Sequence, residues 1–249
     1  MRSSGFGTTD AGASAWSRYR LLAAEHRPER VVLRAVLAGG LGVVVSGLSF
    51  WWAGPIVAVA AFTMHAVYER NRPGAATSWR RGALAERRTG RRLARLDPAG
   101  FHVLHDRAVP GLPATNLDHL VVGITGVYAI ASRRWRWGAR LRSEGRRLWA
   151  GGRPAGDVAG AAARGAHTVS ELLGAELDHD IPVAPLVAVH GARVGRAGLR
   201  HGGVLFCAAG PLPHLISTRP VIFTSAQVAT VAAAAERVLP PMLETLFPD

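Results

Sequence analysis

The sequence predicts an α/β domain, a mixed sheet flanked by helices, preceded by a helical hairpin that crosses a membrane. A long uncharged stretch near the N-terminus predicts the hairpin, and short apolar strands that alternate with helical patterns predict the domain. Hydrophobic residues make up 49% of the 249 residues and charged residues 19%, which excludes a disordered chain. The predicted segments are a disordered and basic amphipathic tail (1–30), the hairpin (31–69), a linker (70–77) and the α/β domain (78–249).

The hairpin is predicted from residues 35–67, which contain no charged side chain when His65 is counted as neutral. One helix of this length would extend about 50 Å, whereas the hydrocarbon core of a bilayer is about 30 Å thick. Two tryptophans and a Gly-Pro pair at 51–55 supply a turn, so we expect helices at 31–50 and 55–68. Arginines on both flanks favour a cell-membrane protein with two spans and both termini in the cytoplasm. The alternative is a buried hairpin in a soluble protein.

The elements of the α/β domain follow from hydrophobic periodicity and turn residues. A helix over 78–96 has a buried stripe at three- and four-residue spacing that includes one acid, Glu86, and an opposite face rich in arginine. The third strand is almost wholly apolar, which is typical of a strand buried on both faces. The predicted strands are 101–105, 117–123, 127–132, 183–190 and 203–207, with a hairpin of 138–142 and 146–150. The later helices are predicted at 158–177, 211–216 and 225–239.

The composition excludes several kinds of chemistry. All 30 basic residues are arginine, against 17 acids, so the net charge is +13 and no lysine can form a Schiff base, act as a base or complete a P-loop. The single cysteine, Cys207, excludes an intramolecular disulfide and a cysteine zinc cluster, and we expect it in the core. His102, His105 and His119 are close in sequence, but the first two face opposite sides of one strand, which disfavours a zinc site.

Two basic segments are candidate binding surfaces. Residues 80–95 and 133–147 each hold seven arginines and one acid. The first segment lies near the second predicted span, where an anionic lipid surface attracts arginine. The second segment interleaves arginine with tryptophan, a combination that suits DNA or RNA phosphates and unpaired bases. Its candidate nucleic-acid-binding residues are Arg133, Arg134, Trp135, Arg136 and Arg140. The alternative is a solvated face whose arginines reflect coding bias.

The domain resembles a known family over about 78–190. Four segments carry the similarity: 82–90 around Glu86, 105–111 with His-Asp and Pro-Gly, 116–123 (Asn-Leu-Asp-His-Leu-Val-Val-Gly), and 126–135 from Gly-Val-Tyr-Ala-Ile to Trp135. The chain resembles the NERD (nuclease-related) domain, a branch of the PD-(D/E)xK nuclease superfamily. This resemblance implies a restriction-endonuclease-like sheet, a divalent metal, usually Mg²⁺, and often an added transmembrane segment or hairpin.

The resemblance assigns roles to individual residues. Asp118 matches the first metal-binding acid and Glu86 matches the helix glutamate. The second acid is replaced by Ala131 and the lysine two residues later by Arg133. Mg²⁺ prefers oxygen ligands and gives up water reluctantly, so Asp118 alone is a doubtful metal ligand. Arg133 can bind a phosphate or pair with Glu86, but it cannot act as a base.

The predicted function is a membrane-anchored, catalytically degraded nuclease-like module that binds nucleic acid or an unknown protein partner without cutting. Glu86, Asp118 and Arg133 would then be vestigial catalytic residues, and no cofactor is expected. One alternative is an active Mg²⁺-dependent nuclease that uses the same three residues. Another is a membrane-associated scaffold with no role in nucleic-acid binding. Convergence of the three side chains in space is the structural check.

Overall fold

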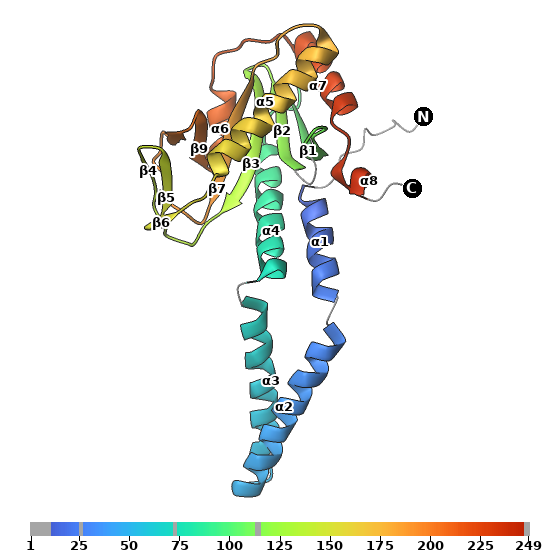
Figure 1. The fold of residues 1–249 in the computed structure, drawn as a ribbon, viewed down its shortest axis with the longest axis vertical. Coiled ribbons are helices and arrows are strands. Elements are labelled where there is room, and N and C mark those ends of the chain that lie inside the picture. Colours follow the sequence, from blue (N-terminus) through green and yellow to red (C-terminus); the bar gives the residue numbers. More distant parts are fainter. Residues whose placement is uncertain (1–10, 25–26, 72–73, 113–115, 247–249) are drawn as a thin grey trace. The chain divides into compact units, whose positions relative to one another are not determined.

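The computed structural model describes residues 11–24, 27–71, 74–112 and 116–246 (Figure 1). The chain forms two compact units. The smaller unit comprises Ala15–Arg81, and the larger combines Gly82–Asp249 with the N-terminal residues through Ser14.

The smaller unit contains most of α1 (Ala13–Ala24), α2 (Arg27–Leu48), α3 (Ala53–Asn71) and the first part of α4 (Ala75–Leu93). Helices α2 and α3 pack as a hairpin through small residues. A Cβ atom added at Gly42 would lie 2.9 Å from Ala58 Cβ, so the two backbones approach closely there.

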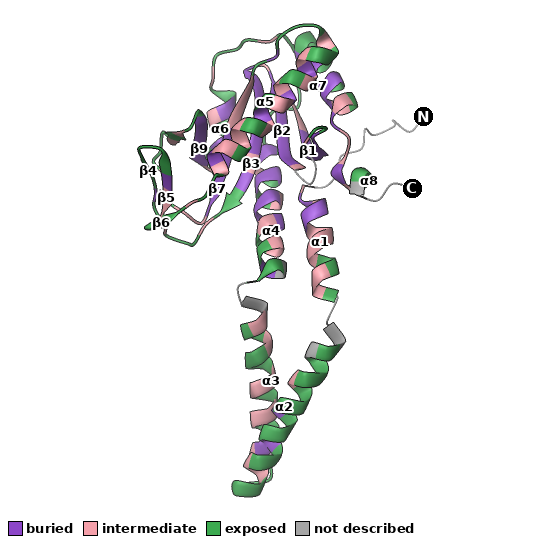
Figure 2. Cartoon of the chain, viewed as in Figure 1, coloured by how far each residue is buried: buried purple, intermediate pink, exposed green. Residues whose placement is uncertain are grey.

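Most large apolar side chains of this hairpin are exposed (Figure 2). Among the described helices, one near the N-terminus, α2 over Val31–Leu48, is long and apolar enough to cross a membrane. Little of that stretch is buried inside the protein, unlike the core helix of a soluble domain. Length and composition therefore support one span, and the second span stays a prediction.

The predicted boundaries of the N-terminal segments need correction. The linker expected at 70–77 is mostly helical, because α3 continues to Asn71 and α4 begins at Ala75. The tail expected to be disordered over 1–14 is ordered at its end, where Ser14 is buried in the first turn of α1. Its first ten residues lie outside the described part of the chain.

The larger unit is built on a six-stranded mixed sheet in the order β1-β2-β3-β7-β9-β8. Strands β1, β2 and β3 form an antiparallel meander, and β7 and β9 extend the sheet in parallel. Helix α5 connects β3 to the parallel strand β7. The predicted α/β mixed sheet is therefore confirmed. The strands are β1 (Phe101–Ala108), β2 (Asn116–Gly123), β3 (Gly126–Arg134), β7 (Val183–His190), β8 (Leu199–His201) and β9 (Val204–Ala208).

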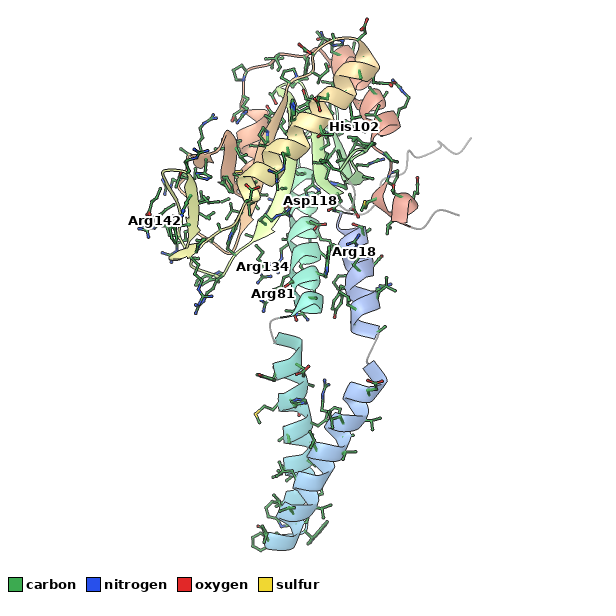
Figure 3. The ribbon with its side chains drawn as sticks, in the orientation of Figure 1. Arg18, Arg81, His102, Asp118, Arg134 and Arg142 are labelled. Carbon is green, nitrogen blue, oxygen red and sulfur yellow. The ribbon has the colours of Figure 1, made fainter. Side chains whose placement is uncertain are left out.

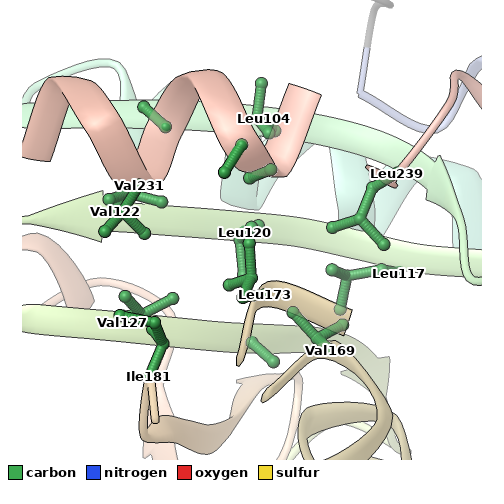
Figure 4. Close-up of a cluster of buried hydrophobic side chains, with 14 of the residues drawn as sticks. Leu104, Leu117, Leu120, Val122, Val127, Val169, Leu173, Ile181, Val231 and Leu239 are labelled. Carbon is green, nitrogen blue, oxygen red and sulfur yellow. The ribbon is translucent and has the colours of Figure 1, made fainter. Parts of the chain in front are cut away.

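Helices cover both faces of this sheet. On one face α5 (Val158–Leu177) and α7 (Ser225–Val238) pack on Leu120 and Val122 (Figure 4). On the other face the end of α4 and the short helix α6 (Leu212–Ser217) pack on β2 and β3. The predicted buried stripe of α4 is confirmed, since all of its positions within the larger unit are buried, including Glu86. The last helix is α8 (Met242–Leu246).

A second, three-stranded sheet follows β3. It consists of β4 (Leu141–Glu144), β5 (Arg147–Ala150) and β6 (Arg153–Pro154). The predicted hairpin is present, but its first strand begins three residues later than expected and its turn is at Gly145 and Arg146. The backbone of Gly145 has φ +57°, a conformation that glycine adopts without strain.

Candidate nuclease-like site and basic surface

Strands β2 and β3 separate at the position of Asp118. Their backbone pairing ends at His119 and Ile130. Beyond that point the N–H of Ser132 donates to Asp118 Oδ2 at 2.6 Å, so a carboxylate replaces the neighbouring backbone as acceptor. Arg133 Nη1 lies 3.4 Å from the same oxygen. Asp118 (labelled in Figure 3) is only 3% exposed. Its contacts with Ser132 and Arg133 take the place of backbone pairing at this end of β2 and β3.

Glu86 comes to the same place from α4. It is 5% exposed, and its Oε2 atom has no hydrogen-bond partner. Burial raises the pKa of Glu86 well above the usual range, and the nearby Asp118 and Asp106 raise it further, against a lowering by Arg133. The predicted residues Glu86, Asp118 and Arg133 are therefore brought together. The ion pair of Arg133 is with Asp118, not with Glu86 as the alternative interpretation expected.

The pKa of Asp118 is also raised. Burial raises the pKa of its carboxyl, although Arg133 and the N–H of Ser132 lower it, and Asp106 adds a further rise. The carboxyl groups of Glu86, Asp118 and Asp106 thus lie near a single guanidinium group, that of Arg133. Burial and the two neighbouring carboxyl groups therefore favour the protonated form of Glu86, whose Oε2 has no hydrogen-bond partner.

Asp106 is the site residue that sequence reasoning did not place. It is completely buried and adopts φ +48°, which few residues other than glycine, asparagine and aspartate tolerate. Its carboxylate accepts the N–H of Ser14 at 2.7 Å, the hydroxyl of Ser14 at 2.6 Å and the side-chain amide of Asn116 at 2.9 Å. Asp106 therefore fastens the N-terminal segment to the end of β1.

Residues 11–14 cover the acidic cluster. Gly12 has φ +70°, and a Cβ atom added to it would lie 3.1 Å from Glu86 Oε2. A Cβ atom added at Gly90 would lie 2.7 Å from Ala11 Cβ, so the segment also lies directly on α4. The chain's own backbone thus occupies the space beside Glu86.

The donor set does not fit a magnesium ion. The position of the second acid holds Ala131, whose side chain packs against an apolar cluster that includes Val187 and Val189. Asp118 is engaged by Ser132 and Arg133, and burial favours the protonated form of Glu86. Within the described ranges, no group of three or more His, Cys, Asp or Glu side chains is arranged to hold a metal. A hard cation that needs several oxygen ligands would find none ready here.

A hydrogen-bonded chain of polar side chains, all buried except the half-buried His105, adjoins the acids. The Nδ1 atoms of His105 and His119 lie 2.8 Å apart, and His119 Nε2 lies 3.2 Å from Ser132 Oγ. Ser132 donates to Thr89 Oγ1 at 2.8 Å. Thr89 in turn lies 2.8 Å from His190 Nε2. Burial lowers the pKa of His119 well below its usual range and that of His190 to about 4, so both are neutral near pH 7.

This polar chain settles the question of the neighbouring histidines. His105 joins it, whereas His102 faces the other way and lies 2.9 Å from Glu236 of α7. The prediction that the two face opposite sides of the strand is confirmed. The chain connects α4, β1, β2, β3 and β7 by hydrogen bonds, so we interpret it as the polar core of the fold.

We expect Glu86→Gln to stabilise the protein at neutral pH and to have little effect in acid. The unfolded carboxyl ionises near 4.5, while the folded one keeps its proton to higher pH. The stability contributed by the protonated form is thus complete below pH 4.5 and is lost as pH rises through the folded pKa. Gln cannot ionise, so its advantage grows with pH to about 1–3 kcal/mol.

Thermal melts of the full chain from pH 4 to 8 measure this difference. Glu171→Gln, which removes an exposed carboxyl on α5, is the matched control. A stability difference between Glu86→Gln and the wild type that does not change with pH would show that Glu86 is already ionised in the folded protein.

A family model described as a nuclease-related domain (NERD) matches residues 81–190. Residues 81–190 thus form a NERD domain. The match runs from α4 to the end of β7 and includes Glu86, Asp118, Ala131 and Arg133. Comparisons with curated proteins and with solved structures gave no significant match.

The NERD domain presents its predicted nucleic-acid-binding arginines to solvent, and Trp135 is partly covered. Arg133, Arg134, Arg136 and Arg140 are exposed at the end of β3 and beyond it. Trp135, however, packs against Phe206 of β9 with ring centroids 6.4 Å apart, because its N–H bonds to His190 and holds the residue at the sheet. Trp135 is half-buried, and its role in nucleic-acid binding stays a prediction. Trp137, which is 84% exposed, has the more accessible ring of the two.

The two basic segments converge in the NERD domain, which the sequence did not predict. Arg92 and Arg88 of α4 and Arg134 of β3 all lower the pKa of His190, so they lie around the end of β7. Arg193 of the following loop pairs through its backbone with Arg140. Further exposed arginines lie on the small sheet, including Arg142 (labelled with Arg134 in Figure 3). We call Arg88, Arg92, Arg134, Arg136, Arg140 and Arg193 the basic surface.

Proposed function

We propose that this protein is a membrane-anchored NERD-domain protein that has lost cleavage and binds nucleic acid through the basic surface. The observation that carries the proposal is the state of the three acids. Glu86 favours the protonated form, Asp118 is held by Arg133, and Asp106 is held by Ser14. None of them offers a free pair of oxygens to a metal or to an attacking water.

The replacement of the lysine supports loss of cleavage. A guanidinium group stays protonated, so Arg133 cannot remove a proton from water. Its position beside Asp118 leaves it 45% exposed, which permits contact with a phosphate. Arg133 therefore fits a role in binding better than one in hydrolysis.

The basic surface supports binding to a polyanion. Its arginines come from α4, β3 and the loops that follow β3 and β7, in a chain of net charge +13. Arg side chains that neutralise phosphates release counterions, which gives tight binding at low salt and weak binding at high salt. The exposed ring of Trp137 beside Arg136 adds a place where an unpaired base can stack.

The apolar helix α2 supports anchoring to a membrane. We propose two spans, formed by α2 and α3, with both termini in the cytoplasm. The exposed apolar side chains of the hairpin have no other partner within the described residues, and an even number of crossings keeps the basic flanks on one side. This topology places the basic surface in the compartment that contains nucleic acid.

The test uses the full-length protein in lipid nanodiscs, because a truncation at residue 78 would remove Ser14 and leave Asp106 without two of its donors. Labelled single- and double-stranded DNA and RNA are incubated with Mg²⁺, Mn²⁺ or EDTA. We expect binding that weakens with salt, and no cleavage above background with either metal. Asp118→Asn and its exposed control Asp157→Asn should both leave this result unchanged.

Two outcomes would contradict the proposal. Metal-dependent degradation that Asp118→Asn abolishes and Asp157→Asn preserves would identify an active nuclease. Absence of binding at low salt by a folded protein would show that the basic surface serves a protein or lipid partner.

A further inference from the structure

The smaller unit contains a cavity of about 800 Å³ between α1, the start of α2, the end of α3 and the start of α4. All residues that line it belong to this unit. It lies at the ends of α2 and α3 that are farthest along the chain from the Trp51-Trp52 turn. No part of the NERD-domain site contributes to it.

The lining carries an excess of positive charge. Arg20, Arg34 and Arg80 line the cavity together with one acid, Glu69. The Nε atoms of Arg34 and Arg80 are shielded from solvent and have no hydrogen-bond partner. A buried guanidinium donor without an acceptor is costly, so two of them at one cavity indicate a missing anionic acceptor.

The rest of the lining is apolar. Val31, Phe62 and Val67 contribute side chains, and the guanidinium carbon of Arg34 lies 5.8 Å from the ring centroid of Phe62. Such a cavity suits a molecule with an anionic end and a hydrocarbon end better than it suits a fully hydrated ion.

The position of the cavity along the helices agrees with this chemistry. Val31 is the first residue of the apolar stretch of α2, so Arg34 lies within the first turn of the candidate span. Arginine at that depth extends its head group toward the interface, where lipid phosphates are found.

We propose that the cavity binds the phosphate group of an anionic phospholipid, with Arg34 and Arg80 as its principal donors and Phe62 against the glycerol and acyl region. This inference rests on the membrane anchoring proposed above. It makes the protein selective for a lipid class, beyond simple insertion. A free phosphate ester offers the same oxygens without the hydrocarbon.

The experiment places the full-length protein in nanodiscs of phosphatidylcholine with increasing phosphatidylglycerol, and native mass spectrometry counts the lipids retained after release. We expect phosphatidylglycerol to be retained over phosphatidylcholine, and Arg34→Gln/Arg80→Gln to lower this preference about tenfold or more, since each arginine attracts anionic lipid by about 1 kcal/mol. Arg18→Gln/Arg81→Gln is the matched control, because it removes the same charge from the same unit at residues that do not line the cavity.

A second measurement does not depend on any variant. In detergent, phosphatidylglycerol should raise the melting temperature of the wild type, whereas phosphatidylcholine and soluble glycerol phosphate at the same concentration should not. Equal stabilisation by glycerol phosphate would assign the cavity to a free phosphate ester and overturn the lipid assignment. Equal losses in both double variants would overturn it in favour of general surface charge.

The two levels of the hypothesis fail differently. If the wild-type protein does not enter nanodiscs or sediment with membranes, the proposed anchoring is wrong, and the lipid site is wrong with it. If the protein inserts but shows no preference between the two lipids, anchoring stands and only the lipid site is wrong.

Discussion

Replacing Arg136 and Arg140 together by alanine is expected to weaken nucleic-acid binding roughly 30-fold near 0.15 M salt. Both side chains are exposed beside Arg193 and Trp137, and within the described part of the chain neither forms an ion pair that its loss would break. Each lost phosphate contact lowers the slope of log affinity against log salt by about 0.9, so the slope should fall by about 2. Fluorescence anisotropy of the full chain in nanodiscs, recorded between about 0.05 and 0.3 M salt, measures both the affinity and its salt slope.

The control variant removes the same number of positive charges from another part of the domain. Arg164→Ala/Arg237→Ala removes two arginines of α5 and α7 that pair with Asp157 and Glu176. We expect this pair to leave the salt slope nearly unchanged. If both double variants lose the same affinity, binding follows net charge and the basic surface has no special role.

Trp137→Ala distinguishes the strands that are bound. Stacking on an unpaired base contributes about 1–3 kcal/mol, so the variant should bind single strands about 5- to 150-fold more weakly and duplexes almost as well as the wild type. Trp135→Ala is not an equivalent control, since it removes core packing against Phe206. Equal binding of single strands by the wild type and Trp137→Ala would exclude stacking.

Asp106→Ala is expected to destabilise the protein by about 3–4 kcal/mol, or roughly 10 °C in melting temperature. The change leaves the N–H and hydroxyl of Ser14 and the amide of Asn116 without their acceptor in a buried place. It also puts a residue with a Cβ atom and no polar side chain at φ +48°. Denaturant or thermal unfolding of the full chain in detergent gives the loss.

Two further variants separate the causes of this loss. Asp178→Ala places alanine at φ +56° on an exposed helix end, so it measures the backbone cost alone. Ser14→Ala removes one donor to Asp106, and a double-mutant cycle with Asp106→Ala should show strong coupling between them. Additive effects of the two changes would show that the N-terminal segment is not held by Asp106.

The N-terminal attachment also has a readout other than stability. In Asp106→Ala, limited proteolysis should cut the chain near residues 11–14 faster than in the wild type, because that segment loses its anchor on the NERD domain. A segment released in this way would uncover Glu86, which Gly12 now covers.

Much of the architecture followed from local patterns. The buried stripe of α4 and the apolar third strand were predicted, since hydrophobic spacing constrains helices and strands directly. The similarity to the NERD domain placed Asp118 and Glu86 near Arg133, and the structure brings them together. Errors at the linker and at the end of the tail arose because residues of weak local preference took the helical conformation of their neighbours.

The sequence by itself determined which chemistry is available. The chain has no lysine, and Ala131 and Arg133 stand at the two positions where the resemblance to the NERD domain implies an acid and a lysine. The tertiary structure alone decided how the remaining groups are used. Ser14 and Asp106 are 92 residues apart, and the raised pKa of Glu86 depends on burial beside two other acids. Trp135 and Trp137 are two positions apart in the sequence, but their burial differs. Trp135 packs against Phe206 of β9, whereas Trp137 is exposed. Distance in space and exclusion of water set these properties, and neither is written in the spacing of residues along the chain.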